Sequence, residues 1–162
     1  MIMEKTEKTN AIRSLDAKKI KYQIHYYDAE EAISGVDVAR VLNEDVNKLF
    51  KTLVTVGKSK KNYVFIVPGD QELDLKKAAK ACNEKSIEMI KSKELLPLTG
   101  YIHGGCSPVG MKKLFKTFIH ISAKDYETIF VSGGKRGIQI ELSLADLEKV
   151  VPMVETDLIV EK

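Results

Sequence analysis

The 162-residue sequence has no tryptophan and only two cysteines, Cys82 and Cys106. Two cysteines without a C-x-x-C motif cannot form the disulfide framework of a small secreted domain, so we expect reduced thiols and a cytoplasmic location. No apolar run approaches the ~20 residues that span a bilayer, and the polar first residues lack the apolar region of a secretory signal. These absences argue against disulfide scaffolds and membrane-spanning proteins, and we expect no membrane partner.

The sequence also lacks a large excess of charge of one sign, because 26 lysines and arginines are nearly balanced by 23 acidic residues and the net charge is +3. This small excess excludes a histone-like polycation, and no helix-turn-helix or zinc-finger pattern is present, so we expect no DNA partner. The three histidines lie far apart, without acidic or cysteine neighbours at ligand spacing. We therefore expect neither a metal site nor a cofactor.

Hydrophobic periodicity predicts alternating strands and short helices. Strands are expected at 22–27, 50–56, 63–67, 86–90, 117–121, 128–131 and 138–142. Helices are expected at 6–20, from Ser34, at 75–82 and from Ser143, and a loop-rich stretch at 95–110. This order predicts the α+β class, a mixed sheet with hairpins flanked by helices, in a single domain over residues 1–162.

A lysine stands early in the predicted strand 50–56. Lys51 shares one face of this strand with Leu53 and Thr55, whereas Thr52 lies on the other face. A lysine in a buried strand is costly unless its ammonium has a partner. The alternative is a lysine at a strand end whose ammonium reaches water.

Two glycine-rich segments are candidates for ligand binding. In the segment 131–137, Gly133 and Gly134 let backbone N–H groups turn toward an anion or a carbonyl oxygen, Ser132 adds a hydroxyl, and Lys135 and Arg136 add charge. A strand follows instead of a helix, so the segment is not a P-loop. The alternative is a hairpin turn with two solvated charges.

The second segment, 99–110, holds Gly104 and Gly105, which could let a ligand approach the backbone closely. Cys106 beside Ser107 suggests a nucleophile, but no G-x-S-x-G elbow is present. A single cysteine in a glycine loop is more often inert.

Five short motifs occur in one order along the chain: Phe50-Lys51-Thr52-Leu53, Leu75-Lys76-Lys77-Ala78-Ala79, Thr99-Gly100-Tyr101 with Gly104-Gly105, Ser107-Pro108-Val109-Gly110, and Val131-Ser132-Gly133-Gly134-Lys135-Arg136-Gly137. This set resembles the YbaK/EbsC family of Cys-tRNA(Pro) deacylases, which are similar to the editing domain inserted in bacterial prolyl-tRNA synthetases. The resemblance implies a mixed β-sheet, partly closed like a barrel and flanked by helices.

The resemblance also implies a substrate site. Lys51 matches the family's essential lysine, Thr52 follows it, and Tyr27, Gly104 and Ser132 match further pocket positions. The remaining residues expected to bind substrate are Gly105, Ser107, Gly133, Gly134, Lys135 and Arg136. In the family, the cysteine thiol of the substrate attacks its own ester and releases the tRNA, so the protein only positions the ester and stabilises the oxyanion. We expect the ammonium of Lys51 and the glycine N–H groups to face one cup.

The implied partners are aminoacyl-tRNA(Pro) and prolyl-tRNA synthetase in a transient complex, and Cys-tRNA(Cys) is a further possible substrate. Two alternatives stay open. The segment 28–35 is shorter than in many relatives, and Ser34 stands where some have an aromatic residue, so the preferred amino acid could be alanine instead of cysteine. The other alternative is a non-catalytic, EbsC-like regulatory or tRNA-binding module.

Overall fold

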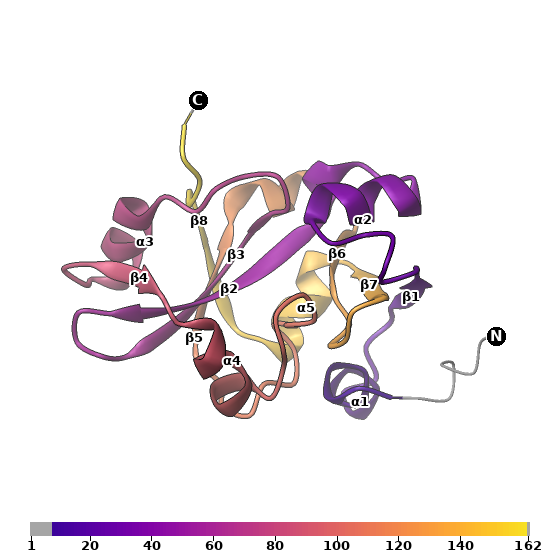
Figure 1. The fold of residues 1–162 in the computed structure, drawn as a ribbon, viewed down its shortest axis with the longest axis horizontal. Coiled ribbons are helices and arrows are strands. Elements are labelled where there is room, and N and C mark those ends of the chain that lie inside the picture. Colours follow the sequence, from indigo (N-terminus) through magenta and orange to yellow (C-terminus); the bar gives the residue numbers. More distant parts are fainter. Residues whose placement is uncertain (1–7, 162) are drawn as a thin grey trace.

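The computed structural model describes residues 8–161, and Figure 1 shows helices packed around β-sheets. The helices are α1 (Asn10–Ala17), α2 (Gly35–Leu42), α3 (Leu75–Cys82), α4 (Ser92–Thr99) and α5 (Leu144–Val150). The strands are β1 (Gln23–Tyr26), β2 (Phe50–Gly57), β3 (Asn62–Pro68), β4 (Ile87–Met89), β5 (Lys116–His120), β6 (Ile129–Ser132), β7 (Ile138–Leu142) and β8 (Met153–Thr156). Short 3-10 turns lie at Val46–Lys48 and Ile121–Asp125.

The strands form two sheets within the described residues. A five-stranded sheet has the order β4-β2-β3-β5-β8, and a three-stranded sheet has the order β1-β7-β6. The β2–β3 hairpin and the β2–β4 pair are antiparallel, whereas β5 pairs in parallel with both β3 and β8. One parallel bridge, Leu49 to Phe130, joins the sheets. The predicted α+β class is confirmed, and the strands make two sheets instead of a closed barrel.

Three clusters of apolar side chains hold the sheets and helices together, and the third packs α2 against Leu49 and Phe130. The first joins β2 and β5 to the three-stranded sheet, α1 and α5, and includes Phe50, Ile119 and Ile140. The second lies under α3, where the rings of Phe65 and Phe118 stack with centroids 5.2 Å apart. Full burial of one such side chain stabilises a fold by roughly 1.5–3 kcal/mol. The first cluster holds β2, a strand of the five-stranded sheet, against the three-stranded sheet, and the site below lies along this strand.

Helix α2 begins where the sequence predicted. Ser34 is its N-cap, with Oγ accepting from the Asp37 backbone N–H at 3.1 Å while the Asp37 carboxylate accepts from the Ser34 N–H at 3.4 Å. Backbone hydrogen bonds from Ile33 and Ser34 lower the pKa of Asp37. This capping box fixes the start of α2 beside the amino end of β2.

Two elements differ from the sequence prediction. The stretch predicted as loop from residue 95 contains most of α4, because Pro97 lies near the helix end and Gly100 closes the helix with φ +88°. A proline there removes only one intrahelical hydrogen bond. Strand β8 was not predicted, since its sequence carries polar residues and its partner β5 is distant along the chain.

Candidate active site

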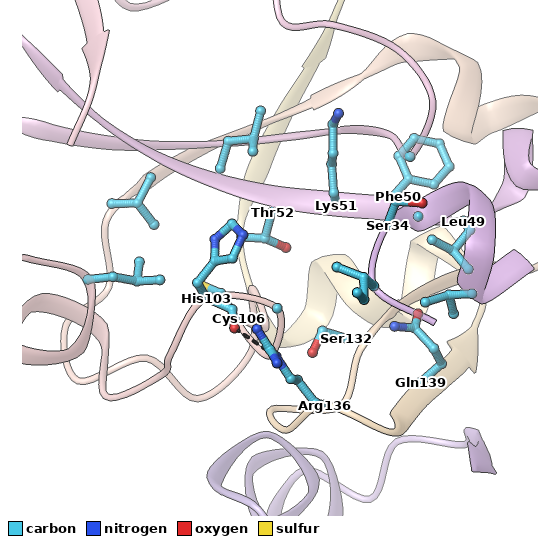
Figure 2. A pocket seen from close by; sticks show the side chains of 18 of the residues that line it. Ser34, Leu49, Phe50, Lys51, Thr52, His103, Cys106, Ser132, Arg136 and Gln139 are labelled. Carbon is cyan, nitrogen blue, oxygen red and sulfur yellow. Dashed lines mark hydrogen bonds between the residues drawn. The ribbon is translucent and has the colours of Figure 1, made fainter. Parts of the chain in front are cut away.

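A cavity of about 690 Å³ lies against β2, between α2, the segment after β4 and the glycine-rich segments. Its volume is typical of a small-molecule or cofactor site. Figure 2 shows side chains from these separate elements converging on it. Of the residues predicted to bind substrate, six line it: Tyr27, Lys51, Thr52, Gly104, Ser132 and Arg136.

Within residues 8–161, no strand pairs at Thr52 with the edge of β2 next to this cavity. On that edge β4 pairs only from Thr55 onward, and the bridge to Phe130 involves Leu49. Main-chain groups of successive strand residues point to opposite edges. The Ile90 N–H donates to the Val54 carbonyl across this edge at 3.3 Å, so the N–H and C=O of Thr52 point the same way, toward the cavity.

Lys51 is half-buried, and its surroundings affect its pKa in two opposite directions. Burial lowers the pKa of Lys51, while the charges of Asp70 and Glu72 act in the opposite direction. Figure 2 shows the ammonium pointing away from Ser132 and Arg136, on the other side of β2. The expected single cup is therefore not what the structure contains, although one cavity includes Lys51 and both glycine-rich segments. The physical reason is strand alternation, which puts Thr52 on the side where Lys51 was expected.

Thr52 directs its side chain toward His103 and the glycine segments (Figure 2). Its hydroxyl oxygen is buried and has no hydrogen-bond partner among the described residues. Thr52 thus offers the cavity an unpaired main-chain N–H and C=O together with an unpaired hydroxyl. Unpaired polar groups in a buried wall are costly, and a ligand that pairs with them recovers that cost.

The two glycine-rich segments fit against each other. Arg136 donates from Nε to the His103 carbonyl at 3.3 Å, which is drawn as a dashed line in Figure 2. A Cβ on Gly104 would lie 2.6 Å from Arg136 Nε, and a Cβ on Gly105 would lie 3.0 Å from Lys135 Cα. These glycines permit contact between the segments, in place of the ligand approach that the sequence suggested at Gly105.

The N–H groups expected to cradle an anion are engaged inside these segments. Gly105 donates to the Ile102 carbonyl at 3.0 Å, and Gly133 donates to the Ile138 carbonyl at 2.9 Å. Gly134 donates to Ser132 Oγ at 3.1 Å. The turns therefore use the N–H groups of Gly105, Gly133 and Gly134 themselves, so these three donors are not available to cradle an anion.

Five of the predicted residues lie outside the cavity lining: Gly105, Ser107, Gly133, Gly134 and Lys135. Ser107 is fully buried, and its Oγ accepts from the Val109 N–H at 3.2 Å. Gly134 and Lys135 border a separate shallow hollow beside Thr9, at the start of α1. Ser107 therefore supports the loop, while Lys135 faces away from the cavity that holds Ser132.

Cys106 lines the cavity as a free, buried thiol. Burial raises its pKa to about 12, so the thiol stays protonated at neutral pH and is a poor nucleophile. Among residues 8–161, no three His, Cys, Asp or Glu side chains gather as metal ligands. No helix in the same range is long and apolar enough to cross a membrane.

Gln139 is a cavity residue that the sequence reasoning missed. It pairs with Ser132 across the β6–β7 hairpin and with His25 on the other side. Its side chain is 6% exposed, and its carbonyl oxygen has no partner among the described residues. The available signal was its position opposite Ser132 in the hairpin, since opposed residues of antiparallel strands share a face.

A family model for the aminoacyl-tRNA editing domain matches residues 29–150, a range that contains β2, both glycine segments and the whole cavity lining except Tyr27. The chain belongs to the aminoacyl-tRNA editing domain family. This confirms the resemblance inferred from the five motifs.

Relatives of this editing domain include EbsC of Enterococcus faecalis, a proposed Cys-tRNA(Pro)/Cys-tRNA(Cys) deacylase. It is 48% identical over 145 residues, which cover 88% of each chain. A proline–tRNA ligase of Thermosipho africanus is 35% identical over 78 residues, which cover 48% of this chain and 14% of the ligase.

The editing-domain fold also matches solved structures. A proposed trans-editing enzyme for prolyl-tRNA synthetase superposes with a TM-score of 0.82 at 22% identity, covering 93% of both chains. The hypothetical protein APE2540 superposes with a TM-score of 0.85 at 18% identity, covering 93% of this chain and 99% of the other. At these identities the likeness supports the fold alone.

Proposed function

We propose that this editing domain deacylates Cys-tRNA(Pro), and also Cys-tRNA(Cys), in the cytoplasm. The observation that carries the proposal is the 48% identity to EbsC over 88% of both chains. The cavity supports it, because its one cysteine is protonated and its described lining contains no Ser–His–acid arrangement. A site of this kind suits a substrate that supplies its own nucleophile.

The proposed reaction begins with the thiol of the cysteinyl group. Its sulfur forms a bond to the ester carbonyl carbon, and the bond from this carbon to the ribose oxygen breaks. The thiol proton passes to that ribose oxygen, so the products are free tRNA and a cyclic thiolactone. The protein contributes by holding thiol and ester close together and by stabilising the oxyanion.

Thr52 is the proposed donor to the oxyanion. Its main-chain N–H points toward the cavity from the unpaired stretch of β2, and its position is fixed by the β3 hydrogen bonds of its neighbours. A rigid donor of this kind stabilises developing negative charge without reorganising. It replaces the glycine N–H groups that the sequence suggested for this role.

Lys51 is proposed to bind a phosphate of the tRNA 3′ end. Its ammonium lies on the opposite side of β2 from Ser132, away from the proposed ester position. A lysine ammonium is a compact charge well suited to a phosphate. Arg136 is the proposed second phosphate ligand, since it borders the same cavity from the other side.

The decisive experiment follows ester loss from Cys-, Ala-, Ser- and Pro-tRNA(Pro). We expect turnover of the cysteinyl ester and at least tenfold slower turnover of the seryl ester, because a hydroxyl is a weaker nucleophile than a thiol. Rapid loss of alanine with slow loss of cysteine would replace the proposal with an alanyl-tRNA(Pro) deacylase. No turnover of any ester would favour a non-catalytic tRNA-binding module.

Lys51→Ala is the accompanying variant. Loss of one phosphate contact is expected to raise KM for Cys-tRNA(Pro) by roughly tenfold. Lys58→Ala is the matched control, because Lys58 is exposed in the β2–β3 turn, away from the cavity lining. An unchanged KM in Lys51→Ala would refute the role of this lysine.

We further propose a transient complex with prolyl-tRNA synthetase as the source of tRNA selectivity. The support is the partial match to a proline–tRNA ligase, in which the related segment is part of the synthetase chain. Addition of the synthetase should raise the rate on Cys-tRNA(Pro) at limiting protein concentration, and an unchanged rate would count against the complex.

A further inference from the structure

Gln139 forms part of the cavity wall without a structural partner for its oxygen. The side chain lies beneath Leu49 and Phe50 and beside Ser132 (Figure 2), and its Oε1 is buried and unpaired among the described residues. A buried amide oxygen without a hydrogen bond destabilises a fold, whereas an apolar side chain of the same size does not. An unpaired oxygen in the wall of a ligand cavity is most simply explained by a hydrogen bond that forms when the ligand binds.

The charges around the cavity narrow down the group that Gln139 would bind. Lys51, Lys91 and Arg136 line the cavity, and none of its described lining residues is acidic. An aminoacyl ester carries an α-amino group, which needs a hydrogen-bond acceptor and finds no carboxylate there. Besides the main-chain carbonyl of Thr52, the lining has two buried side-chain acceptors without a partner among the described residues, Gln139 Oε1 and Thr52 Oγ1.

Of these two oxygens, that of Gln139 suits an amine better. A threonine hydroxyl donates as well as accepts, so it can serve a ribose hydroxyl or a carbonyl equally well. An amide oxygen only accepts, and the broad terminal torsion of glutamine lets it turn toward the cavity. A neutral acceptor also attracts the nearby lysine and arginine side chains less strongly than a carboxylate would, and so stays more available to an amine.

We propose that Gln139 is a specificity-determining residue whose side-chain oxygen binds the α-amino group of the aminoacyl ester. The inference rests on the proposed function. It adds the group that distinguishes a cysteinyl ester from other oxygen esters that carry a thiol. A site built to hydrogen-bond one group rejects an analogue that lacks it.

The test compares two esters and two variants. Cys-tRNA(Pro) is compared with 3-mercaptopropionyl-tRNA(Pro), which keeps the thiol and the ester but has no α-amino group. The wild type should prefer the cysteinyl ester by about tenfold in kcat/KM, which matches the loss of one hydrogen bond. Gln139→Met should lose this preference through a higher KM for the cysteinyl ester alone. Gln139→Glu, which retains an acceptor, should keep it.

Melting temperatures separate recognition from a structural role. Gln139→Met should melt at or above the wild-type temperature, because it removes an unpaired buried oxygen at nearly constant volume. An equal loss of activity on both esters, or an unchanged preference, would overturn the inference while leaving the deacylase proposal in place. Absence of wild-type turnover on either ester would overturn the deacylase proposal and this inference with it.

Discussion

Glu148 on α5 and Glu155 on β8 share a hydrogen bond that requires a proton. Partial burial, followed by the hydrogen bond and the charge of Glu155, raises the pKa of Glu148 to about 7 from its ordinary value of 4.5. Because the folded-state pKa is the higher one, the stabilising contribution is complete below pH 4.5 and is lost as the pH rises through 7. At pH 8 the two carboxylates repel each other.

Glu148→Gln should therefore raise the melting temperature at pH 8 by about 3 °C, which corresponds to ~1 kcal/mol after allowance for solvent screening. At pH 4.5 the gain should vanish, since the wild-type carboxyl is then protonated. Thermal melts at the two pH values measure the difference. Glu127→Gln, at an exposed site, is the control, and an equal shift at both pH values would contradict the assignment.

At the residue scale, alternation along the strand predicted that Lys51 and Thr52 lie on opposite faces, and Figure 2 shows them so. The sequence could not tell which face fronts the glycine segments, because that depends on how the three-stranded sheet docks onto β2. Gln139 was missed for the same reason. Gln139 and Ser132 lie on one hairpin, whereas most of the other lining residues come from distant parts of the chain.

At the element scale, the two glycine segments behave as one unit, since a Cβ on Gly105 would meet backbone atoms of Lys135 and Arg136 at 3.0–3.1 Å. Gly105→Ala should force them apart at a cost of about 1–3 kcal/mol and displace Arg136. We expect a lower melting temperature together with a higher KM. Ile102→Ala, at an exposed position in the same segment, is the control, and a variant with normal stability would show that the contact is loose.

The elements that sequence predicted well have strong local signals. Helix α3 and strand β7 were predicted at their observed bounds, because capping residues or turn glycines delimit them. Helix α4 was missed through the weight given to Pro97, and β8 through its polar sequence. Parallel pairing of β5 with β3 and β8 joins distant segments, for which local patterns carry no information.

At the scale of the whole molecule, a net charge of +3 with few arginines gives only modest attraction to nucleic acid. If two or three phosphates are contacted, the Kd for tRNA should rise roughly 10- to 50-fold between 50 and 200 mM salt. Filter binding with tRNA(Pro) and an unrelated tRNA measures it, and Lys51→Ala, which removes a proposed phosphate contact, should reduce the slope by about one. Tight, salt-insensitive discrimination of tRNA(Pro) by the protein alone would refute this expectation.

The class of the fold and the family were accessible from sequence because composition, periodicity and five ordered motifs are properties of the chain itself. The shape of the cavity was not, because its walls come from both sheets, α2 and the segment after β4. Their relative placement follows from core packing between layers. We propose that residues 1–162 act as one editing domain, as the sequence suggested.

The short unpaired stretch of β2 at Thr52 limits the length of an extended ligand that can pair with this strand. It is bounded by the Leu49 bridge at one end and by β4 at the other, so a longer extended chain would run into occupied main-chain positions. If the aminoacyl end of a tRNA binds here as proposed, we expect a single amino acid to be accepted and an extended polypeptide to be excluded. The same boundary leaves little room for a foreign strand to pair with β2 at this point.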